Sequence, residues 1–204
     1  MNLHTRPYRD ATDLARMKQL LMTGAQTNPA ISYMHPGCVD WDTQCPPDEA
    51  ANQRNLRLWE RVDTEPPTLA AWAIHLRREG SFDLFVSAAV YGTPAHAAIM
   101  DEYVAWATAR ARESGLNTLW PFWAMTYDTV LTELMAARGF VIEVVDPPVP
   151  LFARTLETLP PISLPAGFAV RGVQDAADGR QRAAVTYAAF GCTDDWEAYA
   201  AEYA

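Results

Sequence analysis

The feature that most constrains this chain is an eight-residue pattern that occurs twice. Residues 6–13 read Arg-Pro-Tyr-Arg-Asp-Ala-Thr-Asp, and residues 171–178 read Arg-Gly-Val-Gln-Asp-Ala-Ala-Asp, so the Arg, both Asp and one Ala are identical in register. In each place a predicted strand ends in Arg, and an Asp stands where it would cap a helix. The offset is 171 − 6 = 165 residues, about the length of one domain. We therefore expect one complete domain and then the opening of a second copy, which stops incomplete at Ala204.

Composition favours a packed globular protein. Half of the 204 residues are hydrophobic, and the chain has seven Trp, eight Tyr and seven Phe. The net charge is −9 and no basic stripe is visible, which argues against a nucleic-acid-binding protein. Three cysteines at irregular spacing do not suggest a disulfide framework and favour a reducing cytoplasm. No apolar run approaches the roughly 18 residues of a membrane span, and the N-terminus does not resemble a signal peptide.

Hydrophobic periodicity and turn residues predict strands and helices in a mixed order. Three short strands joined by turns predict an antiparallel meander, and later strands cross over through helices, so we expect a mixed α+β sheet. The segment 25–48 holds four Pro and is expected to be a functional loop, or else to hide a short helix. Strands are expected at 2–8, 56–59, 68–76, 82–90, 118–125, 140–145, 149–155 and 167–173. Helices are expected at 10–24, about 48–53, 94–115, 127–138, 176–190 and 194–203.

This order resembles the GCN5-related N-acetyltransferase fold over residues 1–156. After a Pro-rich linker at 157–166, residues 167–204 resemble the start of another copy. The resemblance is carried by the Arg-x-x-x-Asp-Ala-x-Asp opening, by the strand, break and long helix of 82–112, and by Leu-Met-Ala-Ala-Arg-Gly-Phe at 134–140. The chain also resembles tandem members of this family that are similar to mycothiol synthase. This part of the resemblance is carried by Gly-Cys-Val-Asp-Trp at 37–41 followed by Leu-Arg-Leu-Trp at 56–59.

The resemblance implies an acetyl-CoA site beside the fourth strand, with a Gly-rich loop holding the pyrophosphate at a helix N-terminus. When the family pattern is aligned with 86–96, only Val86 and Gly92 match. Pro94 has no N–H to donate, and His96 would crowd a phosphate unless its ring hydrogen-bonded one. The loop therefore looks degraded. The cofactor-binding residues that the resemblance implies are Val86, Ser87, Ala88, Tyr91, Gly92, Thr93, Ala95 and His96.

The resemblance also implies an acid and a base. The family often has a Tyr that protonates the CoA thiolate at the position occupied here by Met135, which cannot transfer a proton. Tyr127 is the nearest phenol and is a candidate acid, although a Tyr at such a junction is more often structural. His75, on a predicted central strand, is a candidate base or a hydrogen-bonded structural residue. Asp83 and Glu143 are further carboxylate candidates on strands.

Two further groups of residues could be a metal site or a substrate pocket, but their spacing and positions do not favour either. His, Cys and Asp side chains in the 25–48 segment are suitable metal ligands, but their spacing matches no strong zinc pattern, and we expect no metal. Aromatic side chains on predicted strands could line a substrate pocket, although such positions are more typical of core. The residues concerned are His35, Cys38, Asp40, Asp42, Cys45, Trp72, Trp120, Phe122 and Trp123.

Two functions therefore stay open. The first is an acetyl-CoA-dependent N-acetyltransferase acting on an amine of a small molecule or peptide, with a degenerate pyrophosphate loop. The second is a non-catalytic acetyltransferase-like domain that serves structure, dimerisation or partner binding. The second copy's apolar side chains, such as Val170 and Phe190, are expected to pack on the first domain or on another chain in a homodimer. No nucleic-acid or membrane partner is expected.

Overall fold

The computed structural model describes residues 1–27, 34–44, 48–76, 81–121, 127–143, 163–192 and 195–201. The chain divides into two compact units, Met1–Ile142 and Glu143–Ala204. The predicted domain end at residue 156 and most of the predicted linker at 157–166 lie outside the described residues.

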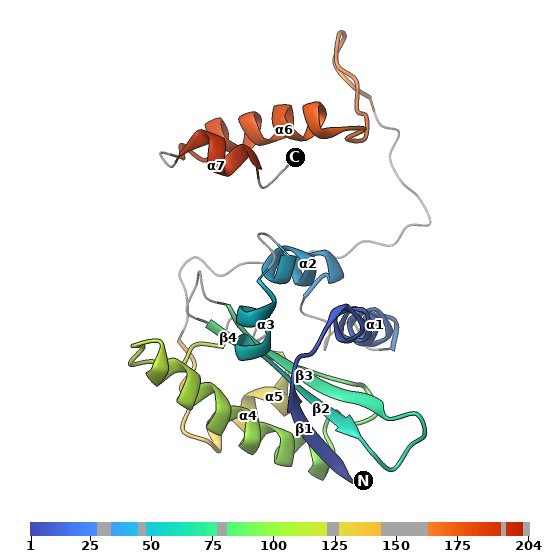
Figure 1. The fold of residues 1–204 in the computed structure, drawn as a ribbon, viewed down its shortest axis with the longest axis vertical. Coiled ribbons are helices and arrows are strands. Elements are labelled where there is room, and N and C mark those ends of the chain that lie inside the picture. Colours follow the sequence, from blue (N-terminus) through green and yellow to red (C-terminus); the bar gives the residue numbers. More distant parts are fainter. Residues whose placement is uncertain are drawn as a thin grey trace. The chain divides into compact units, whose positions relative to one another are not determined.

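The first unit contains a four-stranded antiparallel sheet (Figure 1). Its strands lie side by side in chain order, as the predicted meander requires. A β-bulge at Trp59 and Glu60 shifts the register of β2 against β3. The strands are β1 (Leu3–Pro7), β2 (Leu56–Arg61), β3 (Thr68–Leu76) and β4 (Ser81–Val86). The strands predicted at 2–8, 56–59 and 68–76 are thus confirmed.

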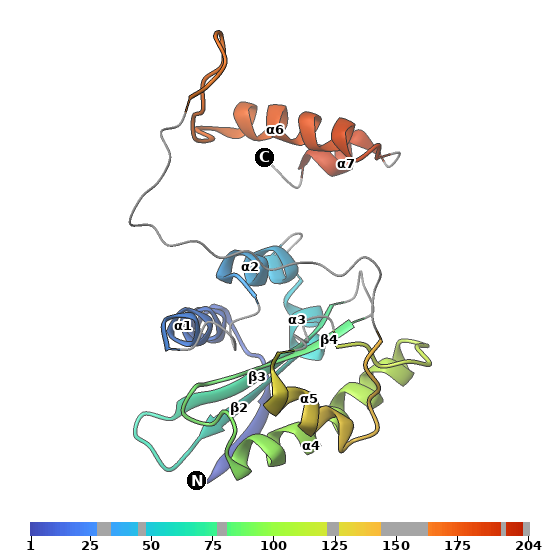
Figure 2. The same ribbon diagram turned by 180° about the vertical axis from the view of Figure 1, so that it is seen from behind.

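Side chains alternate between the two faces of the sheet, and helices cover both (Figures 1 and 2). On one face, here called the α1 face, Leu58 and Trp72 are fully buried with apolar residues of α1 (Ala11–Thr27). On the other, the α4 face, Trp59 and Phe82 are buried with residues of α4 (Pro94–Glu113). Burial of each such side chain contributes about 1.5–3 kcal/mol. The helix residues in these two cores include Leu14, Met17 and Leu21 of α1 and Ile99, Met100 and Tyr103 of α4.

Aspartates begin helices in the first unit, as the sequence predicts near residues 10 and 48. Asp10 accepts the N–H of Thr12 at the start of α1, at 2.8 Å. Asp48 accepts the N–H of Ala51, also at 2.8 Å, at the start of α3 (Glu49–Asn55). Each carboxylate satisfies an N–H that has no partner within its own helix.

The segment expected as a loop or a hidden helix does contain a helix, α2 (Pro36–Gln44). Val39 of α2 is fully buried in the core of the α1 face. Near the end of α2, the backbone carbonyl of Thr43 accepts a hydrogen bond from the side-chain amide of Asn52, at 2.9 Å. The short helix expected here, at about 48–53, corresponds to α3, and α2 was not predicted.

Several predicted strands differ from the structure. β4 ends at Val86 rather than at residue 90, because Ser87 makes the last bond to β3 and its carbonyl then accepts the N–H groups of a turn. Residues 118–121 contain only an isolated bridge, in which Trp120 pairs in parallel with Ser81. Residues 140–143 form no strand, and Phe140 instead donates its N–H to Met135 at a helix end. Residues 122–126 and 144–162 lie outside the described residues.

Among the described residues, the expected parallel part of the sheet is therefore reduced to one bridge. All four strands of the described sheet are antiparallel, and the parallel component is the single bridge at Trp120. The bridge rests on a hydrogen bond from the N–H of Phe82 to the carbonyl of Trp120, at 2.8 Å. The chain thus leaves β4 through α4 and returns beside β4 in parallel. The last described helix of the first unit is α5 (Thr129–Ala136), within the predicted 127–138.

The second unit contains α6 (Ala176–Ala189) and α7 (Trp196–Ala201), within the predicted helices. Tyr187 of α6 packs edge-on against Trp196 and Tyr199 of α7, with ring centroids 5.3 and 5.2 Å apart. The strand predicted at 167–173 is wrong, because these residues form no strand and are exposed. A strand needs a neighbour for its backbone N–H and C=O groups, and no strand is described in this unit.

The repeated sequence pattern nevertheless forms the same local arrangement in both units. Arg6 donates through both terminal nitrogens to the two carboxylate oxygens of Asp13, at 2.6 Å each. Arg171 makes the same paired contact with Asp178. The backbone N–H four residues before each of these aspartates donates to the same carboxylate, from Arg9 at 3.0 Å and from Gln174 at 3.1 Å. We call this arrangement the Arg–Asp clip.

Within the described parts of the chain, no helix combines the length and the apolar character that a membrane crossing would require.

Candidate functional site at the ends of strand β4

The turn after β4 carries most of the predicted cofactor-binding residues. The carbonyl of Ser87 accepts the N–H groups of Val90 and Tyr91, at 2.9 and 3.0 Å. The carbonyl of Val90 then accepts both the N–H and the hydroxyl of Thr93, at 3.1 and 2.6 Å. Gly92 has φ +72°, a left-handed conformation that favours glycine. The turn is therefore closed by its own hydrogen bonds before Pro94 begins α4.

His96 lies in the first turn of α4 with only 1% of its surface exposed. Its Nδ1 accepts the N–H of Gly92, at 3.2 Å, and its ring centroid lies 4.9 Å from that of Tyr91. Burial, with the nearby Arg138 cation, lowers the pKa of His96 to about 4. The ring is therefore neutral near pH 7 and serves as a buried acceptor for the turn.

Tyr91 joins the turn to α5. Its hydroxyl donates to the carboxylate of Asp128, which is the N-cap of α5 and also accepts the N–H of Leu131, at 3.0 Å. Burial raises the pKa of Tyr91 to about 12, and burial also raises the pKa of Asp128. The phenol therefore stays protonated and holds the turn against the helix.

A pyrophosphate bound at this turn would require backbone N–H groups that point toward it. Between residues 90 and 97, six N–H groups donate to acceptors within the turn and the helix, and Pro94 has none. Val86 is buried in the core of the α4 face, while Ser87, Ala88 and Ala95 are half-buried. The residues of this turn therefore do not fit a pyrophosphate unless the bond from Gly92 to His96 breaks.

The other end of β4 gathers buried polar side chains. His75, Ser81 and Asp83 are 5%, 2% and 3% exposed. The ring of His75 stacks on its cross-strand neighbour Phe82, with centroids 4.2 Å apart and an interplanar angle of 3°. This end of β4 therefore places three buried polar side chains close together in sequence and in the sheet.

The strand register separates two of the predicted candidates. His75 pairs with Phe82 and shares the α4 face with it, whereas Asp83 pairs with Ile74, which is buried in the α1 face. Neighbouring positions along a strand point to opposite faces, so His75 and Asp83 do not converge on one substrate atom. Beneath the α4 face, the hydroxyl of Tyr103 donates to the carbonyl of Phe82, at 2.8 Å.

Tyr127, the candidate acid, directly precedes the helix cap Asp128 and is half exposed. The described contacts connect its neighbourhood to Tyr91, at the far end of β4 from His75. No described contact therefore joins Tyr127 and His75. Glu143 is exposed and lies at the edge of the described residues.

No model of a known protein family matches this chain, and a search of curated proteins found no match.

The residues considered as metal ligands or as a pocket are dispersed. The ring of His35 accepts the N–H of Gly37 at 3.0 Å, and Asp40 forms an ion pair with Lys18 at 2.8 Å. Cys38 is an exposed thiol. Trp72 is fully buried as core, and Trp120 is 46% exposed. Cys45, Phe122 and Trp123 lie outside the described residues.

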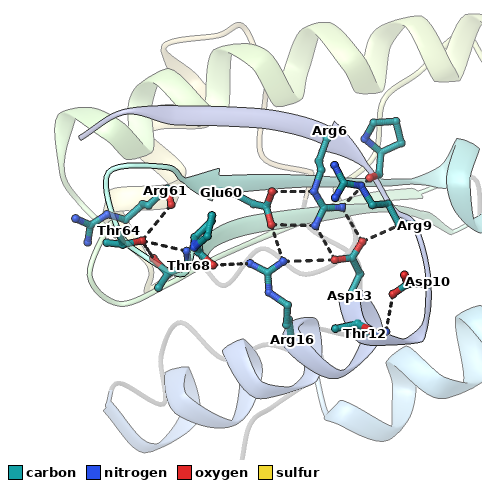
Figure 3. Close-up of polar contacts among 12 residues, drawn as sticks. Arg6, Arg9, Asp10, Thr12, Asp13, Arg16, Glu60, Arg61, Thr64 and Thr68 are labelled. Carbon is teal, nitrogen blue, oxygen red and sulfur yellow. Dashed lines mark hydrogen bonds and ion pairs between the residues drawn. The ribbon is translucent and has the colours of Figure 1, made fainter.

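Sequence reasoning missed a buried polar network in the first unit (Figure 3). Beyond its bonds to Asp13, Arg6 donates through Nε and one terminal nitrogen to Glu60 of β2, at 2.8 and 2.9 Å. Arg16 of α1 donates to the same carboxylate, at 2.5 Å. The repeated pattern that contains Arg6 and Asp13 was the sequence signal for this network. The third member, Glu60, lies 54 residues away from Arg6 in sequence, so the pattern does not reveal it.

Proposed function

We propose that the first unit is a domain of the GCN5-related N-acetyltransferase class, whose members transfer an acetyl group from acetyl-CoA to an amine. The observation that carries this proposal is the path of the chain after the meander. It leaves β4 through a turn with a left-handed Gly92, forms the long helix α4, and returns in parallel beside Ser81 at Trp120. Helices α1, α2 and α3 between β1 and β2 agree with the same resemblance.

Within this class, we infer that the first unit serves a non-catalytic role in structure, dimerisation or partner binding. The N–H of Gly92 is occupied by His96, Pro94 offers none, and Met135 replaces the usual acid. The domain would then keep the shape of an acetyltransferase while its turn holds no cofactor. A cytoplasmic location and a homodimer formed through the second unit belong to the same proposal.

Catalysis is the second candidate function, and the place of His75 on the central strand β3 favours it. In that case the unit would acetylate an amine of a small molecule or peptide, with His75 as the base. His75 stands on a central strand and is buried beside Phe82, which is a position from which a substrate amine could be deprotonated.

Calorimetric titration with acetyl-CoA decides between the two functions. We expect no saturable heat up to millimolar acetyl-CoA, with desulfo-CoA and dephospho-CoA as controls. Micromolar binding that weakens with dephospho-CoA would overturn the non-catalytic function and justify a screen of amines. An experimental structure in which residues 118–125 do not run parallel beside β4 would contradict membership in the class itself.

A further inference from the structure

A hollow of about 440 Å³ lies on the first unit, between the end of β1 and helix α3. Its lining includes Arg6, Tyr8 and Arg9 from the β1–α1 connection and Gln53 and Arg54 from α3. No acidic side chain belongs to the described lining, although the chain as a whole carries a net charge of −9. The hollow lies at the β1 edge of the sheet, whereas the candidate site lies along β4, at the opposite edge.

Arg6 forms a fixed wall of this hollow rather than a binding group. Its guanidinium has five N–H donors. They donate to Glu60 through Nε, to Asp13 and the carbonyl of Pro7 through one terminal nitrogen, and to Asp13 and Glu60 through the other. The side chain is therefore saturated, and Arg6 and Arg16 together balance the charges of Asp13 and Glu60.

Arg9 and Arg54 are different, because among the described residues their guanidinium groups have no hydrogen-bond or ion-pair partner. Both are exposed at the same hollow, and each is attached to a fixed backbone. The N–H of Arg9 is bound to Asp13, and α3 is held at its start by the Asp48 cap. Lys18 and Arg138, by contrast, are held in ion pairs.

Tyr8 forms part of the wall of the hollow and is not a binding group. It is 1% exposed, it belongs to the apolar core of the α1 face, and its hydroxyl is buried with no hydrogen-bond partner in the described structure. A hydroxyl that water cannot reach is equally out of reach of an anion in the hollow. Burial, with the nearby charges of Glu49, Asp10 and Asp13, raises the pKa of Tyr8 to about 12, so the phenol stays neutral.

We propose that this hollow binds a small anion through a carboxylate or phosphate group, with Arg9 and Arg54 as the two cationic arms. Guanidinium groups donate paired hydrogen bonds to both kinds of oxyanion. The side-chain amide of Gln53, an exposed residue of the same lining, is a further donor. This site is independent of the proposed acetyltransferase class.

Calorimetric titration of the whole protein with inorganic phosphate, and separately with citrate, tests the proposal at low ionic strength. We expect saturable binding of at least one of the two anions, and the preferred anion identifies the source as a phosphate or a carboxylate. The double variant Arg9→Gln/Arg54→Gln should bind at least about tenfold more weakly, since a hydrogen bond to a charged group is worth about 1.5–3 kcal/mol. Tyr8→Phe should bind the anion as tightly as the wild type, because the buried Tyr8 hydroxyl does not reach the hollow.

Arg112→Gln is the matched control, because Arg112 is an exposed arginine of α4 that does not line the hollow. The affinity of this variant for the anion should stay within about twofold of that of the wild type, since remote surface charges are screened. Far-UV circular dichroism checks that each variant is folded. The proposal is overturned if neither anion binds saturably, or if Arg112→Gln weakens binding as much as the double variant does.

Discussion

Replacing Glu60 by Gln removes the shared acceptor of the network in Figure 3. Glu60 is 8% exposed, and its carboxylate accepts hydrogen bonds from Arg6 at 2.8 and 2.9 Å and from Arg16 at 2.5 Å. Gln keeps one acceptor oxygen but turns an NH₂ group toward two cations. Loss of one partner from a buried ion pair costs about 3–5 kcal/mol. We expect the lower end of that range, because Arg6 keeps its bonds to Asp13.

The pKa of Glu60 gives a second route to the same magnitude. Its hydrogen bond from Arg6, followed by that from Arg16, outweighs burial and holds its pKa at about 2, against 4.5 ordinarily. At 1.36 kcal/mol per pKa unit, this difference corresponds to about 3 kcal/mol of folding stability. Because the folded-state pKa is lowered, the contribution is complete above pH 4.5 and is lost as the pH falls toward 2.

Urea unfolding of the wild type and Glu60→Gln measures both effects. At pH 7 the variant should be less stable by about 3 kcal/mol, and the difference should shrink steadily as the pH is lowered from 4.5 toward 2. Asp63→Asn is the control, because Asp63 pairs with Arg61 at the surface and its loss should change stability little. A difference below about 1 kcal/mol at pH 7, or one that does not shrink in acid, would refute this reasoning.

Two further predictions concern the turn after β4. His96 is buried with a pKa of about 4 against 6.5 ordinarily, so the wild type should lose up to about 3 kcal/mol as the pH falls from 6.5 to 4. His96→Gln should show a flatter stability–pH curve over that interval in urea unfolding, and equal slopes would contradict a buried neutral ring. Gly92→Ala should lower stability by about 1 kcal/mol, because its φ is +72° while an added Cβ meets only Val130, at 4.0 Å. Gly24→Ala, inside α1 with open space for a Cβ, should instead be neutral or stabilising, and thermal melts that rank the two alike would argue against this.

Local sequence signals predicted much of the first unit. The strands at β1, β2 and β3 follow from alternation and bounding turns, and the caps at Asp10 and Asp48 mark the helix starts. The end of β4 was not predictable in this way. The run Ser-Ala-Ala-Val at 87–90 is as apolar as a strand, and only the hydrogen bonds of the turn distinguish it.

The site was less accessible to sequence reasoning, because its contacts depend on register. The separation of His75 and Asp83 onto opposite faces requires the pairing of β3 with β4. The bond from Gly92 to His96 spans only four residues, yet it depends on the ring being buried, which the pattern does not reveal. Glu60 is positioned against Arg6 by the pairing of β1 with β2.

The Arg–Asp clip has a consequence for the order of folding. Arg171 and Asp178 close their clip in a unit that has no described strand, so the clip needs no sheet to form. A seven-residue closure costs little chain entropy, whereas the bond from Arg6 to Glu60 must bring together residues 54 apart. The connection between β1 and α1 can therefore form early in folding. The Nε side of the Arg6 guanidinium then remains available to bind Glu60 when β2 pairs with β1. A segment that closes on itself in this way brings an early folding contact with it, whether or not a sheet is present.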